Sequence, residues 1–110
     1  MRDLLLDYWN FSKVKGFIYI LTNKNNSVLY TGVTSNLSER IKQHKLRKHP
    51  DSFSAQYNCN KLVYFEIYDT IGEAIVREKI IKGGSRKKKL DLINSTNPGW
   101  SDLFRDPGTG

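Results

Sequence analysis

The chain has 110 residues, of which 38% are hydrophobic and 26% are charged. A chain of this length forms one domain with a single small core, and its apolar content excludes a disordered tail or a fibre. Eighteen Lys and Arg residues against eleven Asp and Glu residues give a net charge of +7 at pH 7. This excess favours a polyanionic partner, with nucleic acid as the first candidate.

The cysteine and histidine content excludes two kinds of site. Cys59 is the single cysteine, so no internal disulfide forms, and with only His44 and His49 beside it the chain cannot assemble a four-ligand zinc site. The first apolar run, residues 4–6, is too short for a signal peptide or a membrane-spanning helix. We therefore expect a soluble, cytoplasmic protein without a membrane partner.

The first half of the chain predicts an extension and a β-hairpin. Residues 1–15 mix apolar and charged side chains with no clean period, which indicates an N-terminal extension. Residues 16–22 (GFIYILT) are β-branched and aromatic, and the turn-forming residues 23–26 separate them from a second run, 27–32. Because the first strand is apolar on both faces, we expect it inside a sheet with helices above and below.

The rest of the chain predicts three helices and one more strand. Asn36 followed by Glu39 starts a helix that runs to about residue 48. A polar connection with room for one helical turn follows at 52–60, and residues 62–68 form a third strand. Thr70 is the N-cap of a predicted helix that runs to about Lys82, and Ser85 is the N-cap of another that ends near Asn94.

Tyr19 and Tyr30 stand on the two strands of the predicted hairpin. A four-residue loop pairs Thr22 with Ser27 and, by the same count, places Tyr19 opposite Tyr30 on one face, so that both phenols can act on one ligand. A five-residue loop would send them to opposite faces. The simpler alternative is a packed cross-strand pair of aromatic rings.

Arg40 and His44 share one edge of the first predicted helix. They lie one turn apart beside the Leu37/Ile41 stripe, and we expect them to face inward. A guanidinium at a helix–sheet boundary suits bidentate contact with a phosphate, and an imidazole can accept or relay a proton near neutral pH. The alternative is a solvated basic helix edge.

On the next predicted helix, Ile71, Ala74, Ile75 and Ile81 form an apolar stripe. Glu78 falls in the middle of this stripe. A buried carboxylate is costly unless it has a cationic partner or a metal. One interpretation is a structural pair with Lys82 or Arg40. The other is that one carboxylate oxygen holds Mg²⁺, with waters and a substrate phosphate completing the octahedron.

Twelve of the eighteen basic residues fall in two segments, 40–48 and 77–89. They are either solvated helix faces or contacts to nucleic acid phosphates. The residues that we predict to bind nucleic acid are Lys45, Arg47, Lys48, Arg86, Lys87, Lys88 and Lys89.

Two triplets, Phe17-Ile18-Tyr19 and Tyr30-Thr31-Gly32, followed in order by Arg40, His44 and Glu78, resemble the GIY-YIG nuclease superfamily. Either triplet alone is weak evidence, whereas the ordered set is specific. The small stand-alone bacterial GIY-YIG proteins are similar in four further stretches, LYTGVTSNLSERIKQH, KLVYFEIYDT, AIVREKIIKGGSRKKK and NPGW.

The resemblance covers residues 16–104, which we take as the nuclease domain, with residues 105–110 as a tail. Phe17 replaces the Gly of the first triplet and Thr31 replaces the Ile of the second. The family also has a C-terminal Asn, and the spacing does not choose between Asn94 and Asn97.

The resemblance implies an α/β (α+β) fold, a three-stranded antiparallel sheet flanked by helices, and a divalent-metal-dependent endonuclease with Mg²⁺ or Mn²⁺ at Glu78. In the roles that the family suggests, Tyr19 is the general base on the attacking water and His44 helps to receive the proton. Tyr30 positions water or phosphate, and Arg40 offsets phosphoryl charge. Because a phenol of ordinary pKa is a poor base at neutral pH, these roles require Arg40 or metal charge to stabilise a tyrosinate.

The expected substrate is DNA, cut with low sequence specificity, because the chain has no room for a separate DNA-reading domain. Aromatic side chains of the N-terminal extension favour single-stranded or branched DNA through base stacking, and RNA remains an alternative. The competing class is a catalytically inactive nucleic-acid-binding module of the same fold. We expect a monomer or weak dimer, and the sequence does not indicate which protein partners it has.

Overall fold

The computed structural model describes residues 14–105. The predicted extension at 1–15 and tail at 105–110 lie almost wholly outside these residues, as do the extension's aromatic side chains. In the described part of the chain, no helix is long and apolar enough to cross a membrane.

Three antiparallel strands form the sheet, in the order β2-β1-β3. The strands are β1 (Gly16–Thr22), β2 (Leu29–Thr34) and β3 (Lys61–Tyr68). β1 lies in the centre, which is the position that its apolar character on both faces predicted.

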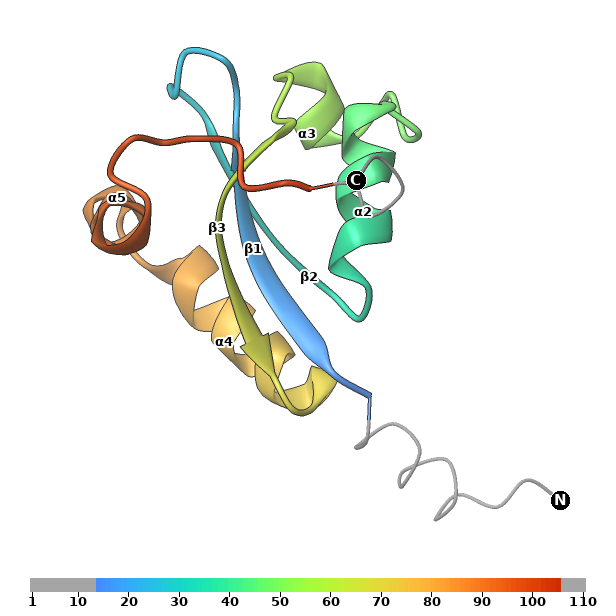
Figure 1. The fold of residues 1–110 in the computed structure, drawn as a ribbon, viewed down its shortest axis with the longest axis vertical. Helices are drawn as coiled ribbons and strands as arrows, with labels where there is room; N and C mark the ends of the chain where they lie inside the picture. Colours follow the sequence, from blue (N-terminus) through green and yellow to red (C-terminus); the bar gives the residue numbers. More distant parts are fainter. Residues whose placement is uncertain (1–13, 106–110) are drawn as a thin grey trace, which may run out of the picture.

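Helices cover both faces of the sheet (Figure 1). α2 (Leu37–Lys45) and α3 (Phe53–Gln56) lie on one face, and α4 (Ile71–Gly83) and α5 (Arg86–Thr96) lie on the other. Successive residues of β1 point to opposite faces, so Ile18 and Ile20 pack with α4 and α5 while Tyr19 and Leu21 pack with Ile41 of α2. The predicted fold class is therefore confirmed.

The predicted N-caps are present. The side chains of Asn36, Thr70 and Ser85 each accept a hydrogen bond from a backbone amide in the first turn of their helices. α2 is shorter than predicted and ends at Lys45. The reason lies just beyond it, where Arg47 adopts a left-handed conformation with φ 53° and turns the chain away.

The hairpin register differs from the prediction by two residues. Thr22 pairs with Leu29, so Tyr19 lies opposite Gly32 and β2 occupies 29–34 rather than 27–32. The Asn23 side chain causes the shift, because its Oδ1 accepts hydrogen bonds from the amides of Ser27 at 2.8 Å and Val28 at 3.2 Å. These amides would otherwise start the ladder. A shift of two residues preserves the face of every side chain, so Tyr19 and Tyr30 still share one face.

The segment after α5 returns along β3. The buried side chain of Asn97 donates to the carbonyl of Val63 at 3.1 Å, and the amide of Leu103 donates to the carbonyl of Leu62 at 2.7 Å. Lys45 of α2 forms an ion pair with Asp102 at 2.5 Å. The C-terminal segment thus closes the α2 side of the core beside β3.

Candidate active site

Tyr19 reaches the edge of the sheet by crossing β2. Its ring and hydroxyl lie over Gly32, and a Cβ built at that position would overlap both. The side chain is 1% exposed and still reaches Tyr30, with ring centroids 6.3 Å apart. A residue with a side chain at position 32 would clash with the Tyr19 ring, so the second triplet requires glycine there.

A hydrogen-bonded chain leads from Tyr19 into two helices. The Tyr19 hydroxyl lies 3.0 Å from Nε2 of His44, and Nδ1 of His44 lies 2.9 Å from Oγ of Ser54. Ser54 is buried and lies 3.3 Å from Oγ of Ser52, the N-cap of α3. Ser54 is missing from the sequence prediction, because a serine in a polar connection carries no signal until the fold places it beside His44.

Tyr30 completes the cluster from the neighbouring strand. Its ring centroid lies 5.4 Å from that of His44, in an edge-on arrangement. The structure thus brings together Tyr19, Tyr30 and His44, which come from β1, β2 and α2.

Arg40 lies at the rim of this cluster and is exposed. The expectation that Arg40 faces inward is wrong: His44 on the same edge of α2 contacts Tyr19, whereas Arg40, one turn earlier, is exposed. Arg40 nevertheless lines a hollow of about 120 Å³ together with Tyr30 and His44. Its guanidinium is therefore accessible from solvent at the rim of this hollow.

Burial keeps the Tyr19–His44 pair neutral. Burial, reinforced by Tyr30, raises the pKa of Tyr19, and this outweighs the lowering by the Arg40 charge. Burial and then the Arg40 charge lower the pKa of His44 to about 4. A standing tyrosinate is therefore not the resting state, because burial outweighs the Arg40 charge, one of the two charges expected to stabilise it.

Glu78 is 9% exposed on α4, and its charge raises the pKa of Tyr19. Its Oε1 lies 3.8 Å from Nζ of the exposed Lys82, so the structural pairing with Lys82 is present as a long ion pair. Within residues 14–105, no three His, Cys, Asp or Glu side chains gather into a metal cluster. Glu78 thus offers a single carboxylate, which is the type of donor that Mg²⁺ accepts.

The predicted nucleic-acid contacts separate into two groups. Lys45 is held by Asp102 and by the carbonyl of Asn60, and Lys89 donates to the carbonyl of Gly84 at 2.9 Å, at the end of α4. Both lysines have partners within the fold, and their contact with nucleic acid stays a prediction. Lys87 pairs with Asp91 on the surface of α5, and the remaining predicted contacts are exposed: Arg47, Lys48, Arg86 and Lys88.

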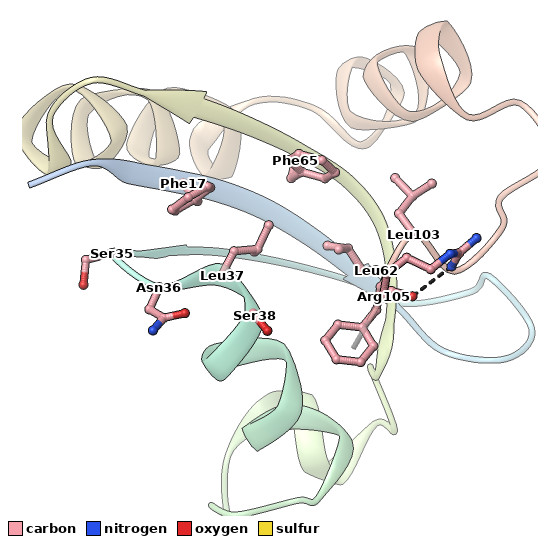
Figure 2. Close-up of a pocket in the computed structure, with 10 residues that line it drawn as sticks. Phe17, Ser35, Asn36, Leu37, Ser38, Leu62, Phe65, Leu103 and Arg105 are labelled. Carbon is pink, nitrogen blue, oxygen red and sulfur yellow. Dashed lines mark hydrogen bonds between the residues drawn. The ribbon is translucent and has the colours of Figure 1, made fainter. Parts of the chain in front are cut away.

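A larger, apolar hollow of about 450 Å³ lies on the other edge of α2 (Figure 2). Phe17, Leu37, Phe65 and Leu103 line it, and it contains none of the predicted catalytic side chains. Phe17, which replaces the Gly of the first triplet, thus stands in an apolar environment away from the Tyr19–His44 pair.

Neither candidate asparagine lines the hollow that Arg40, Tyr30 and His44 share. Asn97 ties the C-terminal segment to β3 and also bonds the backbone of Ser101. Asn94 is exposed and accepts a hydrogen bond from the indole of Trp100 at 2.8 Å. Both side chains hold the Asn-Pro-Gly-Trp turn together.

The family model of the GIY-YIG catalytic domain matches residues 15–91. The UPF0213 protein of Clostridium perfringens is 43% identical over 83 residues, covering 72% of this chain and 83% of that protein. A UPF0213 protein of Syntrophus aciditrophicus is 36% identical and covers 76% and 94%. The solution NMR structure of a UPF0213 protein from Bacillus halodurans superposes with a TM-score of 0.51 at 28% identity, covering 80% of this chain and 92% of that one. On these matches and on the geometry above, the chain belongs to the family of GIY-YIG catalytic domains.

Proposed function

We propose that this protein is a divalent-metal-dependent nuclease that hydrolyses phosphodiester bonds of DNA with low sequence specificity. The observation that carries the proposal is the contact between Tyr19, His44 and Tyr30 at one sheet edge, with Arg40 at its rim and Glu78 within electrostatic reach. A phenol, an imidazole, a guanidinium and a carboxylate are the groups that phosphodiester hydrolysis needs for proton transfer and charge stabilisation.

The Tyr19–His44 hydrogen bond supports a proton relay rather than a free tyrosinate. We assign the His44 tautomer in which Nδ1–H donates to Ser54 and Nε2 accepts the Tyr19 hydroxyl. As the oxygen of water bonds to phosphorus, the P–O bond to the leaving group breaks, and the leaving oxygen keeps the bonding electron pair and takes a proton from solvent. The phenol oxygen takes the proton of the attacking water. The phenol's own proton passes to Nε2 of His44. Tyr19 therefore stays neutral throughout, as its raised pKa requires.

The other groups stabilise and orient the phosphate. Arg40 lies at the solvent-exposed rim of the hollow, where its guanidinium can donate two hydrogen bonds to the non-bridging oxygens of the phosphate. The Tyr30 hydroxyl orients the attacking water or the phosphate from β2. Glu78 would hold Mg²⁺ or Mn²⁺, which when bound supplies a Lewis acid for the phosphoryl oxygens and lowers the pKa of bound water.

Glu78→Gln tests this function, because it preserves the shape of the side chain and removes its charge. Cleavage of labelled single-stranded, duplex and branched DNA, and of RNA, is measured with Mg²⁺, Mn²⁺ or EDTA. The wild type should cut with metal and stop in EDTA, and Glu78→Gln should cut at least about a hundredfold more slowly. DNA affinity in EDTA and the unfolding midpoint should not fall.

The matched control is Glu73→Gln on the same helix. Glu73 accepts a hydrogen bond from the hydroxyl of the N-cap Thr70 at 2.9 Å, and a Gln side chain can accept the same bond. This variant should therefore keep its activity and lose about 0.3–1 kcal/mol of stability, because it removes a negative charge from the first turn of α4. Wild-type protein that binds DNA and never cuts it would refute the nuclease and support the inactive binding module. Normal cleavage by Glu78→Gln would refute the metal role.

A further inference from the structure

An exposed row of aromatic rings leads outward from Tyr30. Phe53 lies nearly parallel to Tyr30, with centroids 6.3 Å apart and an interplanar angle of 24°. The ring centroid of Tyr57 lies 4.6 Å from that of Phe53. Phe53 and Tyr57 are each 49% exposed. We call Tyr30, Phe53 and Tyr57 the aromatic row, which begins in the candidate active site and ends in solvent.

The turn that carries the outer rings is held firmly. Ser52 caps it by accepting from the amide of Ala55, and the buried Ser54 is anchored both to His44 and, through its carbonyl, to the amide of Cys59 at 2.7 Å. Rings that are already fixed lose little conformational entropy when a ligand binds. One short helix thus orients the imidazole on its inner side and presents Phe53 on its outer side.

Cations flank the row on both sides. The hollow on one side of Tyr30 contains Arg40, Arg47 and Lys48. The hollow on the other side, about 390 Å³, contains Phe53, Lys82 and Lys89. None of the described residues that line either hollow is an acid. An extended polyanion that crosses Tyr30 would therefore meet positive charge before and after the aromatic rings, which is the pattern of a single-stranded nucleic acid groove.

We propose that the aromatic row stacks an unpaired nucleobase beside the scissile phosphate, so that the substrate is a single strand or a duplex with an unpaired nucleotide at the cut. This inference rests on the proposed nuclease function. In an intact duplex both faces of each base are covered by its neighbours, so Phe53 has no face to stack on. An aromatic ring accepts any base, which agrees with low sequence specificity.

The experiment separates binding from cutting. Short oligonucleotides that contain 2-aminopurine are titrated with protein in EDTA, as single strands of DNA and of RNA and as a blunt DNA duplex. Stacking quenches 2-aminopurine fluorescence, and anisotropy gives the Kd. The variants are Phe53→Leu, which keeps an apolar side chain but removes the ring, and Phe53→Trp, which restores a ring. Phe65→Leu is the control, because Phe65 is an exposed aromatic residue beside the apolar hollow on the other edge of α2.

We expect the wild type to bind single strands more tightly than duplex and to quench the probe. Phe53→Leu should weaken single-strand binding about 5- to 100-fold, abolish the quenching and leave duplex binding unchanged. Phe53→Trp should restore both signals, and Phe65→Leu should behave as wild type. Comparison of the DNA and RNA strands shows which sugar the groove accepts.

Equal binding of single strand and duplex, or an unaltered Kd in Phe53→Leu, would overturn the inference. A shift from dimer to monomer in Phe53→Leu, with nucleic acid binding unchanged, would assign the row to a contact between copies instead. If quenching occurs but no metal supports cleavage, the aromatic row stands as a binding site and the nuclease function fails. If duplex is cut well and Phe53→Leu is fully active, the nuclease stands and this inference fails.

Discussion

The two faces of the sheet each carry a cluster built on tyrosine, and the clusters have opposite designs. On the α4 face, Glu66 accepts hydrogen bonds from Tyr64, from Tyr68 at 2.6 Å and from Arg77 at 2.9 and 3.2 Å. On the α2 face, Tyr19 faces the neutral imidazole of His44. In the first network the charges of Glu66 and Arg77 neutralise each other. In the second, Arg40 is exposed at the rim, and Glu78 acts on Tyr19 electrostatically from α4.

The titration behaviour reflects this difference. Burial raises the pKa of Glu66, but the hydrogen bonds from Arg77, Tyr64 and Tyr68 outweigh it and the net pKa is lowered. Burial and the bond to Glu66 raise the pKa of Tyr64 to about 12. A closed network of this kind stabilises the fold, while an open one of similar residues leaves polar groups for a ligand.

The largest expected effect separates the two clusters by function. Tyr19→Phe keeps the ring over Gly32 but removes the hydroxyl of the relay, so single-turnover cleavage should fall about a hundredfold or more. Tyr68→Phe removes a hydroxyl from the closed network, so cleavage should stay normal while stability falls by about 1 kcal/mol. Urea unfolding and single-turnover assays on both variants measure this. Comparable activity losses in the two variants would break the distinction between the faces.

An intermediate effect concerns pH, because the two clusters lose stability in different windows. As pH falls below 6.5, the unfolded chain protonates His44 first, since the folded pKa is lowered to about 4. The free energy of unfolding should therefore decrease between about pH 6.5 and 4. Glu66, with its lowered pKa, contributes stability above about pH 4.5 that is lost as pH falls through its folded pKa.

Urea unfolding at a series of pH values tests this prediction. His44→Asn should reduce the dependence of the unfolding free energy on pH between about pH 6.5 and 4. Glu66→Gln should reduce it below about pH 4.5. If His44→Asn has the wild-type slope between pH 6.5 and 4, the histidine does not titrate as the buried neutral partner of Tyr19.

The smallest expected effect lies outside both clusters, on α5. Arg86 and Lys88 are exposed there, and we predict that they contact phosphates. Replacing both by Gln should weaken binding and make the negative slope of log K against log salt shallower by roughly 1 to 2. The single-turnover rate at saturating protein should stay at the wild-type value. An unchanged slope would identify this segment as a solvated helix face.

Local sequence signals predicted most of the fold correctly. Asn36, Thr70 and Ser85 were correct as N-caps, because a side-chain cap depends only on its own first turn. The central place of β1 followed from its apolar character on both faces. The hairpin register was wrong by two residues, because the Asn23 side chain competes with the backbone ladder and loop length alone does not reveal this.

The sequence by itself determined which reactive residue types exist and in what order. It also put Tyr19 and Tyr30 on one face, because a register shift of two residues leaves every side chain on its face. Only the tertiary structure decided their environments. It left Arg40 exposed, lowered the pKa of His44 by burial, joined His44 to Ser54 and lined up Phe53 and Tyr57 beside Tyr30. Exposure, desolvation and ring contacts arise between elements that are distant in the chain, whereas residue order and helical or strand period are local properties.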